Sequence, residues 1–306
     1  MNFSDPNEAS EPPQALRPIV CDIPLDILRV IFELSARSSS RMALHLSLVS
    51  RLIHNWMDTV IYDVVWIDSQ RQAEKFVEAI QSKPSTFCQR IKVLCIPYGV
   101  LHTTAATILP FCPDLEGLAC WTPEPLSLPS ILTLARTRRL SLNICGSNGP
   151  FIQPDFSARL FTRITHLELF DIERAWLQWH GFEHMPDLTH LSVYWTGHST
   201  QCPPTLMPFV ARVFDACAKM RALVINGREF PEEPSTEGLR IFHDPRVVVM
   251  AHAVNPPRGF RYEWEAQWFA EPCMWDTADE IVALQGTLQW DALPPPGPDS
   301  DEDDET

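Results

Sequence analysis

The sequence has little glycine and lacks the cysteine patterns of several common protein classes. Only 11 of its 306 residues are glycine, against 28 prolines. Because proline ends helices and begins loops without adding flexibility, we expect many short elements. The nine cysteines contain no Cys-x-x-Cys pair, so the sequence predicts neither a zinc ribbon nor a disulfide framework. We interpret the cysteines as reduced, intracellular thiols.

Basic residues and long apolar runs are also scarce. Lys and Arg total 24 against 39 Asp and Glu, which gives a net charge of −15. This charge repels the phosphates of nucleic acids and anionic membranes. No stretch reaches the roughly 18 apolar residues of a membrane-spanning helix, and residues 1–14 hold no apolar run typical of a signal peptide. We therefore expect no nucleic-acid partner, no membrane partner, and a location in the cytoplasm, the nucleus or both.

The signatures of common enzyme classes are missing as well. There is no Gly-x-Ser-x-Gly elbow and no glycine loop that would bind phosphate. His180, Glu183 and His184 match the His-x-x-Glu-His arrangement, in which a helix presents two zinc ligands and a catalytic carboxylate. Gly181 and Pro186 disfavour a helix there. We predict no enzyme activity, no catalytic residues, no metal and no cofactor, and a zinc hydrolase is a remote alternative.

The features that are present divide the chain into five segments. The two ends are polar and rich in proline, and the last one carries most of its charge at Asp301–Glu305. Such composition buries too little apolar surface to order itself. We predict a disordered tail at 1–18, a helical module at 19–67, a repeat region at 68–255, a tryptophan-rich cap at 256–290 that covers the last repeat, and a disordered acidic tail at 291–306.

The helical module has apolar residues at helical spacing. Pro24 suits the start of a helix, and an apolar face runs from Ile27 to Phe32. A second apolar stripe runs from Met42 to Ile53, and the β-branched run at 64–67 indicates a strand. Helices as few and short as these have little interior of their own, so the module needs a partner or a flanking domain.

The order of residues in this module is similar to that of a known family. Residues 23–32 read IPLDILRVIF and residues 46–51 read LSLVSR. The module resembles an F-box, particularly the divergent kind common in fungi, although Ile53 stands where many F-boxes have tryptophan. The resemblance implies a trio of helices that docks on a Skp-type adaptor and, through it, on a cullin ubiquitin ligase. The positions that match the family, and are thereby implied to bind the adaptor, are Pro24, Leu25, Ile27, Leu28, Ile31, Phe32, Leu48, Val49 and Arg51.

A short apolar pattern recurs along the repeat region. Its central leucines are residues 94, 118, 140, 167, 191 and 223. Intervals of this size are typical of leucine-rich repeats, in which a strand alternates with a helix. Amphipathic stretches at 73–80 and 206–217 indicate helices between strands. We predict an α/β fold in which a small helical module precedes an irregular, leucine-rich-repeat-like solenoid of parallel strands backed by helices. A doubly wound α/β domain is the alternative.

One face of the predicted sheet offers a recognition surface. Residues that alternate with the inward leucines should point to the concave side, and a mixed aromatic and polar surface suits protein recognition. His166 and His190 occupy equivalent places in neighbouring repeats, which allows a metal pair, but a polar ladder is the more common arrangement. The predicted client-binding residues are Trp121, Arg139, His166, Glu168, Phe170, His190 and Tyr194.

Together these features predict a non-catalytic, substrate-recruiting F-box subunit of a ubiquitin ligase. The module at 19–67 would bind the Skp-type adaptor, and the repeat surface would hold a client protein of unknown identity. The alternative is a repeat-protein scaffold with no ligase role, whose helical module packs only on its own solenoid.

Overall fold

The structure is a computed structural model. It describes residues 23–82, 88–124, 134–143, 155–170, 177, 179–195, 206–227, 244–251, 259–269 and 272–287. Both predicted tails, at 1–18 and 291–306, lie outside the described residues. Within the described ranges, no helix is both long and apolar enough to span a membrane.

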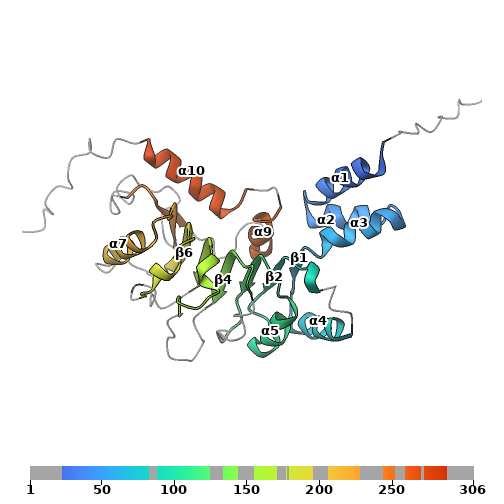
Figure 1. Ribbon diagram of the computed structural model, residues 1–306, viewed down its shortest axis with the longest axis horizontal. Coiled ribbons are helices and arrows are strands. Elements are labelled where there is room, and N and C mark those ends of the chain that lie inside the picture. Colours follow the sequence, from blue (N-terminus) through green and yellow to red (C-terminus); the bar gives the residue numbers. More distant parts are fainter. Residues whose placement is uncertain are drawn as a thin grey trace, which may run out of the picture.

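Three short helices form the N-terminal module (Figure 1). They are α1 (Leu25–Ala36), α2 (Ser40–Ser47) and α3 (Arg51–Ile61). The second predicted stripe is shared by α2 and α3, because Ser50 starts a new helix by accepting a hydrogen bond from Ile53 N (3.2 Å). The small core of the module consists of Ala36, Ala43, Ile53, Met57 and Val60.

Eight parallel strands follow in a single sheet. Their order in space is the order of the sequence, β1 to β8. The strands are β1 (Val64–Trp66), β2 (Val93–Ile96), β3 (Gly117–Cys120), β4 (Arg139–Asn143), β5 (His166–Phe170), β6 (His190–Trp195), β7 (Ala222–Gly227) and β8 (Val247–Ala251). All of the predicted repeat strands are therefore confirmed.

The register of the sheet shows why the leucine pattern predicted it. Leu94 lies beside Leu118 and Leu140 beside Leu167, and the row continues through Leu191, Leu223 and Val247. These side chains join the main core on the outer side of the sheet. A strictly sequential strand order is that of a solenoid, since a doubly wound sheet reverses its order partway. The predicted α/β, leucine-rich-repeat-like fold is confirmed.

The outer side of the sheet is covered by α4 (Gln70–Ser82), α5 (His102–Ile108) and α7 (Leu206–Ala216) (Figure 1). Short 3-10 turns stand in other connections, including Phe182–His184. Gly181 before that turn has a φ of 92°, a conformation that ends helical structure. The prediction that His180, Glu183 and His184 do not share a helix is confirmed.

The two C-terminal helices differ from the predicted cap in their position. These helices, α9 (Gly259–Ala266) and α10 (Met274–Gly286), lie across the inner face of the sheet (Figure 1). Trp264 of α9 packs on residues of β2 and β3, and Trp275 of α10 packs beside Ala222 and Val224 of β7. Trp275 clusters with residues of the last two strands, where a cap on the last repeat was predicted, whereas Trp264 packs on β2 and β3 near the other end of the sheet.

The start of α10 is stabilised by a capping contact. The helix begins at Met274, with Cys273 as its N-cap. The carboxylate of Asp276 accepts a hydrogen bond from the Cys273 N–H (3.0 Å), and an acidic group in the first turn is favoured by the helix dipole. Thr277 is already helical, and its hydroxyl donates back to the Cys273 carbonyl (3.2 Å).

Candidate functional site

The first candidate site is an exposed apolar surface on the N-terminal helices. It comprises Leu25, Ile27, Val30, Ile31, Leu34, Leu44, Leu48, Val49 and Leu52, and we call it the N-terminal apolar surface. Leu25 is 62% exposed and Leu48 is 83% exposed. Soluble monomers seldom expose contiguous apolar surface without a partner for it.

The residues implied by the F-box resemblance lie in or beside this surface. Pro24, Leu25, Ile27, Ile31, Leu48, Val49 and Arg51 are exposed, whereas Leu28 and Phe32 are half-buried. Phe32 packs on the core of the module, with its ring centroid 6.5 Å from that of Trp56. None of the nine side chains is buried, so all of them are available in part to a partner.

The edge of the module is tied to the solenoid by a charged contact. Arg37, which follows α1, donates from Nη2 to Asp63 Oδ2 (2.8 Å), just before β1. Burial raises the pKa of Asp63, and the Arg37 guanidinium opposes that shift. The backbone carbonyl of Asp63 accepts from the N–H groups of Lys92 and Val93. The contact therefore joins α1 to the beginning of the sheet.

The second candidate site is the inner face of the sheet, where the client-binding residues were predicted to be exposed. The central row of that face, Ser141, Glu168 and Ser192, is buried. Glu168 accepts from Ser141 Oγ (2.6 Å) and from Tyr194 Oη (2.9 Å). Trp121 donates to Ser141 Oγ (2.8 Å). Burial raises the pKa of the Glu168 carboxyl, and the hydrogen bonds from Ser141 and Tyr194 oppose that shift.

Aromatic rings complete the cover of this row. Phe170 stacks on Tyr194 with centroids 4.2 Å apart, and Trp121 meets the edges of Phe170 and Trp264. Of the seven predicted client-binding residues, Glu168 and His190 are buried and the other five are half-buried. The prediction of an exposed concave ladder was wrong, because α9 and α10 cover that face.

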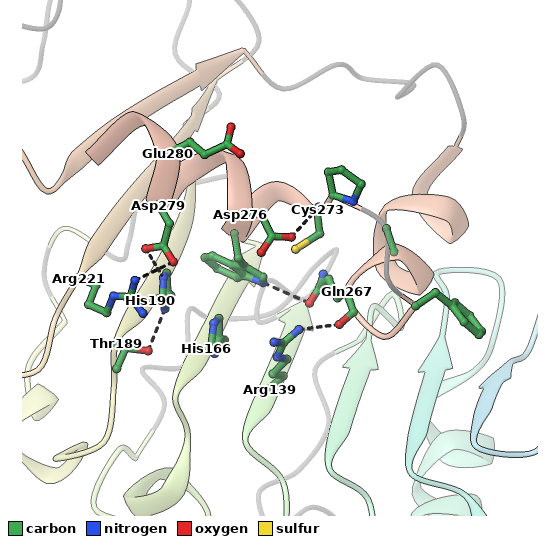
Figure 2. A pocket seen from close by; sticks show the side chains of 14 residues that line it. Arg139, His166, Thr189, His190, Arg221, Gln267, Cys273, Asp276, Asp279 and Glu280 are labelled. Carbon is green, nitrogen blue, oxygen red and sulfur yellow. Dashed lines mark hydrogen bonds and ion pairs between the residues drawn. The ribbon is translucent and has the colours of Figure 1, made fainter. Parts of the chain in front are cut away.

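A cavity of about 640 Å³ remains between the starts of β4–β7 and the C-terminal helices (Figure 2). Its floor is formed by Arg139, His166, His190 and Arg221. Its opposite wall carries Trp275, Asp276, Asp279 and Glu280 of α10. We call it the α10 cavity. It brings together three of the seven predicted client-binding residues, namely Arg139, His166 and His190.

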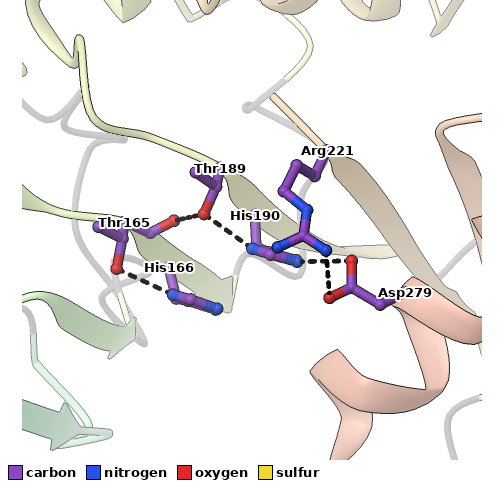
Figure 3. Close-up of polar contacts among 6 residues, drawn as sticks. All are labelled: Thr165, His166, Thr189, His190, Arg221 and Asp279. Atoms are coloured by element: carbon purple, nitrogen blue, oxygen red, sulfur yellow. Dashed lines mark hydrogen bonds and ion pairs between the residues drawn. The ribbon is translucent and has the colours of Figure 1, made fainter. Parts of the chain in front are cut away.

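The two histidines on the floor of the α10 cavity are stacked. Their ring centroids are 4.3 Å apart and their planes differ by 6°. The Nδ1 atom of His166 lies 2.9 Å from Thr165 Oγ1, and that of His190 lies 2.8 Å from Thr189 Oγ1 (Figure 3). The equivalent contacts in neighbouring strands form the polar ladder that the repeat predicts.

Protonation of this stack is disfavoured. Burial is the main cause that lowers the pKa of His166 to about 2, and the charge of a protonated His190 contributes. Burial also lowers the pKa of His190, and the Asp279 carboxylate opposes that shift. His190 Nε2 lies 3.2 Å from Asp279 Oδ1, and Arg221 Nη2 lies 3.0 Å from Asp279 Oδ2. Asp279 thereby links α10 to two strands.

Asp279, His190 and Thr189 follow one another in the order of a catalytic triad, but the Thr189 hydroxyl is not available as a nucleophile. The Thr189 hydroxyl also donates to the Thr165 carbonyl (2.9 Å), which occupies the proton that a general base would have to remove. Among the described residues, no group of three or more His, Cys, Asp or Glu side chains is arranged to hold a metal ion. The arrangement is suited to binding and to packing.

Sequence reasoning found only the strand side of the α10 cavity. Asp276, Asp279 and Glu280 fall within the predicted tryptophan-rich cap at 256–290, but nothing in their spacing indicates which strands they approach. Arg221 precedes a predicted strand and gave no separate signal.

Comparisons with known proteins add little to this description. No family model matches the sequence, and no curated protein matches it. Among solved structures, an internalin from Listeria monocytogenes aligns with 60% of this chain at 12% sequence identity and a TM-score of 0.28. The chain spans 63% of that structure's length.

Proposed function

We propose that this chain is a non-catalytic protein-interaction subunit, and more specifically an F-box protein that docks on a Skp-type adaptor. The observation that carries the proposal is the coincidence of two independent features. The positions that match the F-box pattern include Leu25, Ile31 and Leu48, and the same side chains form part of the N-terminal apolar surface. A helix whose apolar residues served only an internal core would bury them.

The energetics favour docking over a free surface. Burial of apolar area contributes roughly 25 cal/mol per Å² removed from water, and the N-terminal apolar surface presents large aliphatic side chains on α1, α2, α3 and the turn between α2 and α3. Charged groups such as Arg29 and Glu33, which pair at 2.6 Å, lie on the same module. A hydrophobic centre with charged groups around it is the usual composition of a stable interface.

The proposed mechanism is proximity. An adaptor bound to the N-terminal apolar surface would connect the chain to a cullin ligase, and a client held elsewhere on the solenoid would gain a high effective concentration of its lysines near that ligase. The chain itself then needs no catalytic residues. A scaffold with no ligase role is the second candidate, and it rests on the solenoid fold alone.

The test is binding of the purified full-length chain to a purified Skp-type adaptor, measured by titration calorimetry. Replacing Leu25, Ile31 and Leu48 together by serine should weaken binding by roughly 100-fold or more, since central apolar anchors dominate such interfaces. The matched control replaces three exposed apolar residues of other regions, Tyr98, Leu101 and Leu284, by serine. It should bind like the wild type.

Two outcomes would contradict the ligase proposal. The wild-type chain could fail to bind the adaptor while keeping its cooperative thermal unfolding, in which case the scaffold function is the one to pursue. Equally weakened binding in both triple variants would show that the adaptor binds exposed apolar residues nonspecifically and does not recognise the N-terminal apolar surface.

A further inference from the structure

The floor of the α10 cavity has two similar halves, of which only one is filled. In the filled half, the Asp279 carboxylate lies between His190 Nε2 and Arg221 Nη2, at 3.2 Å and 3.0 Å (Figure 3). In the other half, His166 and Arg139 are neighbours in register on β5 and β4, and both line the cavity (Figure 2). Across the ranges that the structure describes, no carboxylate bonds to His166 Nε2 or to the Arg139 guanidinium. A histidine and an arginine thus occur in both halves, although Arg221 precedes β7 and His190 is in register with Ala222, and one half holds a carboxylate.

The open half is held in a defined geometry. Arg139 Nη1 donates to the Gln267 carbonyl (2.8 Å), and its guanidinium lies 5.0 Å from the ring centroid of Trp268. His166 is fixed by its stack on His190 and by Thr165. An arginine has five N–H donors in a fixed plane, so most of those of Arg139 stay available. Groups held in place before binding lose little entropy when a ligand arrives.

We propose that the His166–Arg139 half of the α10 cavity binds a carboxylate side chain of an acidic peptide segment in a partner protein. The filled half is the internal precedent, because the chain itself places a carboxylate between His190 and Arg221 in the same cavity. The cavity volume of about 640 Å³ exceeds that of one carboxylate. Phe269, Pro272 and Trp275 also line it and offer apolar contacts to the rest of a peptide. The site is separate from the N-terminal apolar surface, so the proposal does not depend on adaptor docking.

The charges around the α10 cavity determine how strongly the acidic peptide is expected to bind. Arg139, Arg221 and the N-terminus of α10 attract an anion, whereas Asp276, Asp279 and Glu280 on the same helix repel it, and Asp279 already pairs with Arg221. Asp276 accepts a hydrogen bond from Cys273 N and is thereby directed to the helix end. The arginines do not outnumber the carboxylates, so binding must rest on directed hydrogen bonds to Arg139 and on contacts that the peptide makes beyond its carboxylate.

The test uses the full-length chain and N-acetylated tetraglutamate amide as the probe, with the tetraglutamine peptide for comparison. Calorimetry should show saturable binding of one glutamate peptide and no binding of the glutamine peptide. Arg139→Gln should weaken binding by roughly tenfold, since a hydrogen bond to a charged group is lost. Arg138→Gln is the matched control, because it removes the same charge from an exposed neighbour. It should change the affinity less than about twofold.

A second variant keeps the test decisive if Arg139→Gln destabilises the fold. Asp276→Asn removes a repelling charge, and its amide oxygen can still accept the Cys273 N–H bond. It should tighten binding of the glutamate peptide. Because the tail at 299–305 holds six carboxylates of its own, a full-length variant with those six residues as Asn or Gln should bind the peptide at least as tightly.

Three results would overturn the proposal. The first is that the folded wild type does not bind the glutamate peptide. The second is that Arg138→Gln and Arg139→Gln weaken peptide binding equally. The third is that acetate or inorganic phosphate at equal molarity displaces the peptide fully. The last result would identify a site for small anions in place of a peptide site. Adaptor binding should be unchanged in all these variants, so failure here is distinguishable from failure of the proposed function.

Discussion

The imidazoles of His166 and His190 stack face to face, 4.3 Å apart, beneath the edge of Trp275. Two imidazolium rings at this separation would repel each other strongly, so the packing of α10 on the sheet requires that at most one of the two rings be positively charged. The stack is therefore a place where protonation acts on the fold.

We predict that the free energy of unfolding decreases as the pH falls below 6.5. The folded-state pKa of both histidines is lowered, that of His166 to about 2. The unfolded chain then binds more protons than the folded chain below the ordinary pKa of about 6.5. Between pH 7.5 and 5, His166 alone should cost about 2 kcal/mol. Urea unfolding of the wild type and of His166→Gln measures the difference.

His166→Gln should lose the part of the pH dependence of the unfolding free energy that comes from the His166 imidazole. Glu168 and Asp63 have raised pKa values and act in the opposite direction at lower pH, but they are present in both proteins. An identical pH profile for the two proteins would show that the stack is not the cause.

Tyr194→Phe should lower the free energy of unfolding by roughly 1 to 3 kcal/mol, because it leaves one buried oxygen of Glu168 without its donor. Chemical denaturation at pH 7 measures the loss. Tyr98→Phe is the control, since Tyr98 is exposed and its hydroxyl is accessible to water. Comparable effects from the two substitutions would contradict the role of the Glu168 contact.

Gly117→Ala should destabilise the packing of α9. A methyl group at Gly117 would overlap the ring of Trp268, which is held by Trp264 and Arg139. We expect a loss of roughly 1 to 3 kcal/mol, typical of overpacking in a close-packed region. Adding Trp268→Leu should recover part of it. Gly99→Ala, where the new methyl would be 3.9 Å from the nearest carbonyl oxygen, should be nearly neutral in thermal unfolding.

Met57→Ala and Leu48→Ala should separate folding from binding in the N-terminal module. Met57 is fully buried in the core of the module, so its truncation should cost about 2 to 5 kcal/mol in that module's stability. Leu48 is exposed, so its truncation should leave stability within about 0.5 kcal/mol and weaken adaptor binding. Circular dichroism melting and calorimetry measure the two effects. A destabilising Leu48→Ala would mean that this side chain packs within the chain.

The strands were predictable from the sequence because each repeat specifies its own. A buried leucine at a fixed place in each repeat forms one row of the sheet, as Leu118 and Leu140 do, and the spacing alone reveals it. The helix of α7 was predictable for the same reason, since Phe209 and Val213 occur at helical spacing on its buried face.

The cover of the inner face was not predictable from spacing. Trp264 of α9 and Trp268, two residues beyond that helix, meet Trp121 and Gly117 far away in the sequence, and no local pattern encodes such a pairing. Glu168 was predicted to lie on an open concave face because it alternates with the inward leucines, yet both Glu168 and its neighbour Ser141 are buried. Their burial depends on hydrogen bonds with each other and with Trp121, which only the folded chain brings together.

The return of α9 and α10 across the sheet has a consequence for how the chain folds. In a simple solenoid each repeat contacts only its neighbours, so folding can spread from any repeat and the ends can fray separately. Here the contacts Arg139–Gln267 and His190–Asp279 join residues 128 and 89 positions apart, so the middle strands gain part of their stability only after the last helices have docked. During synthesis the N-terminal helices and the early repeats emerge first with their polar inner face still open to water, and a chain cut short before α10 would keep it open.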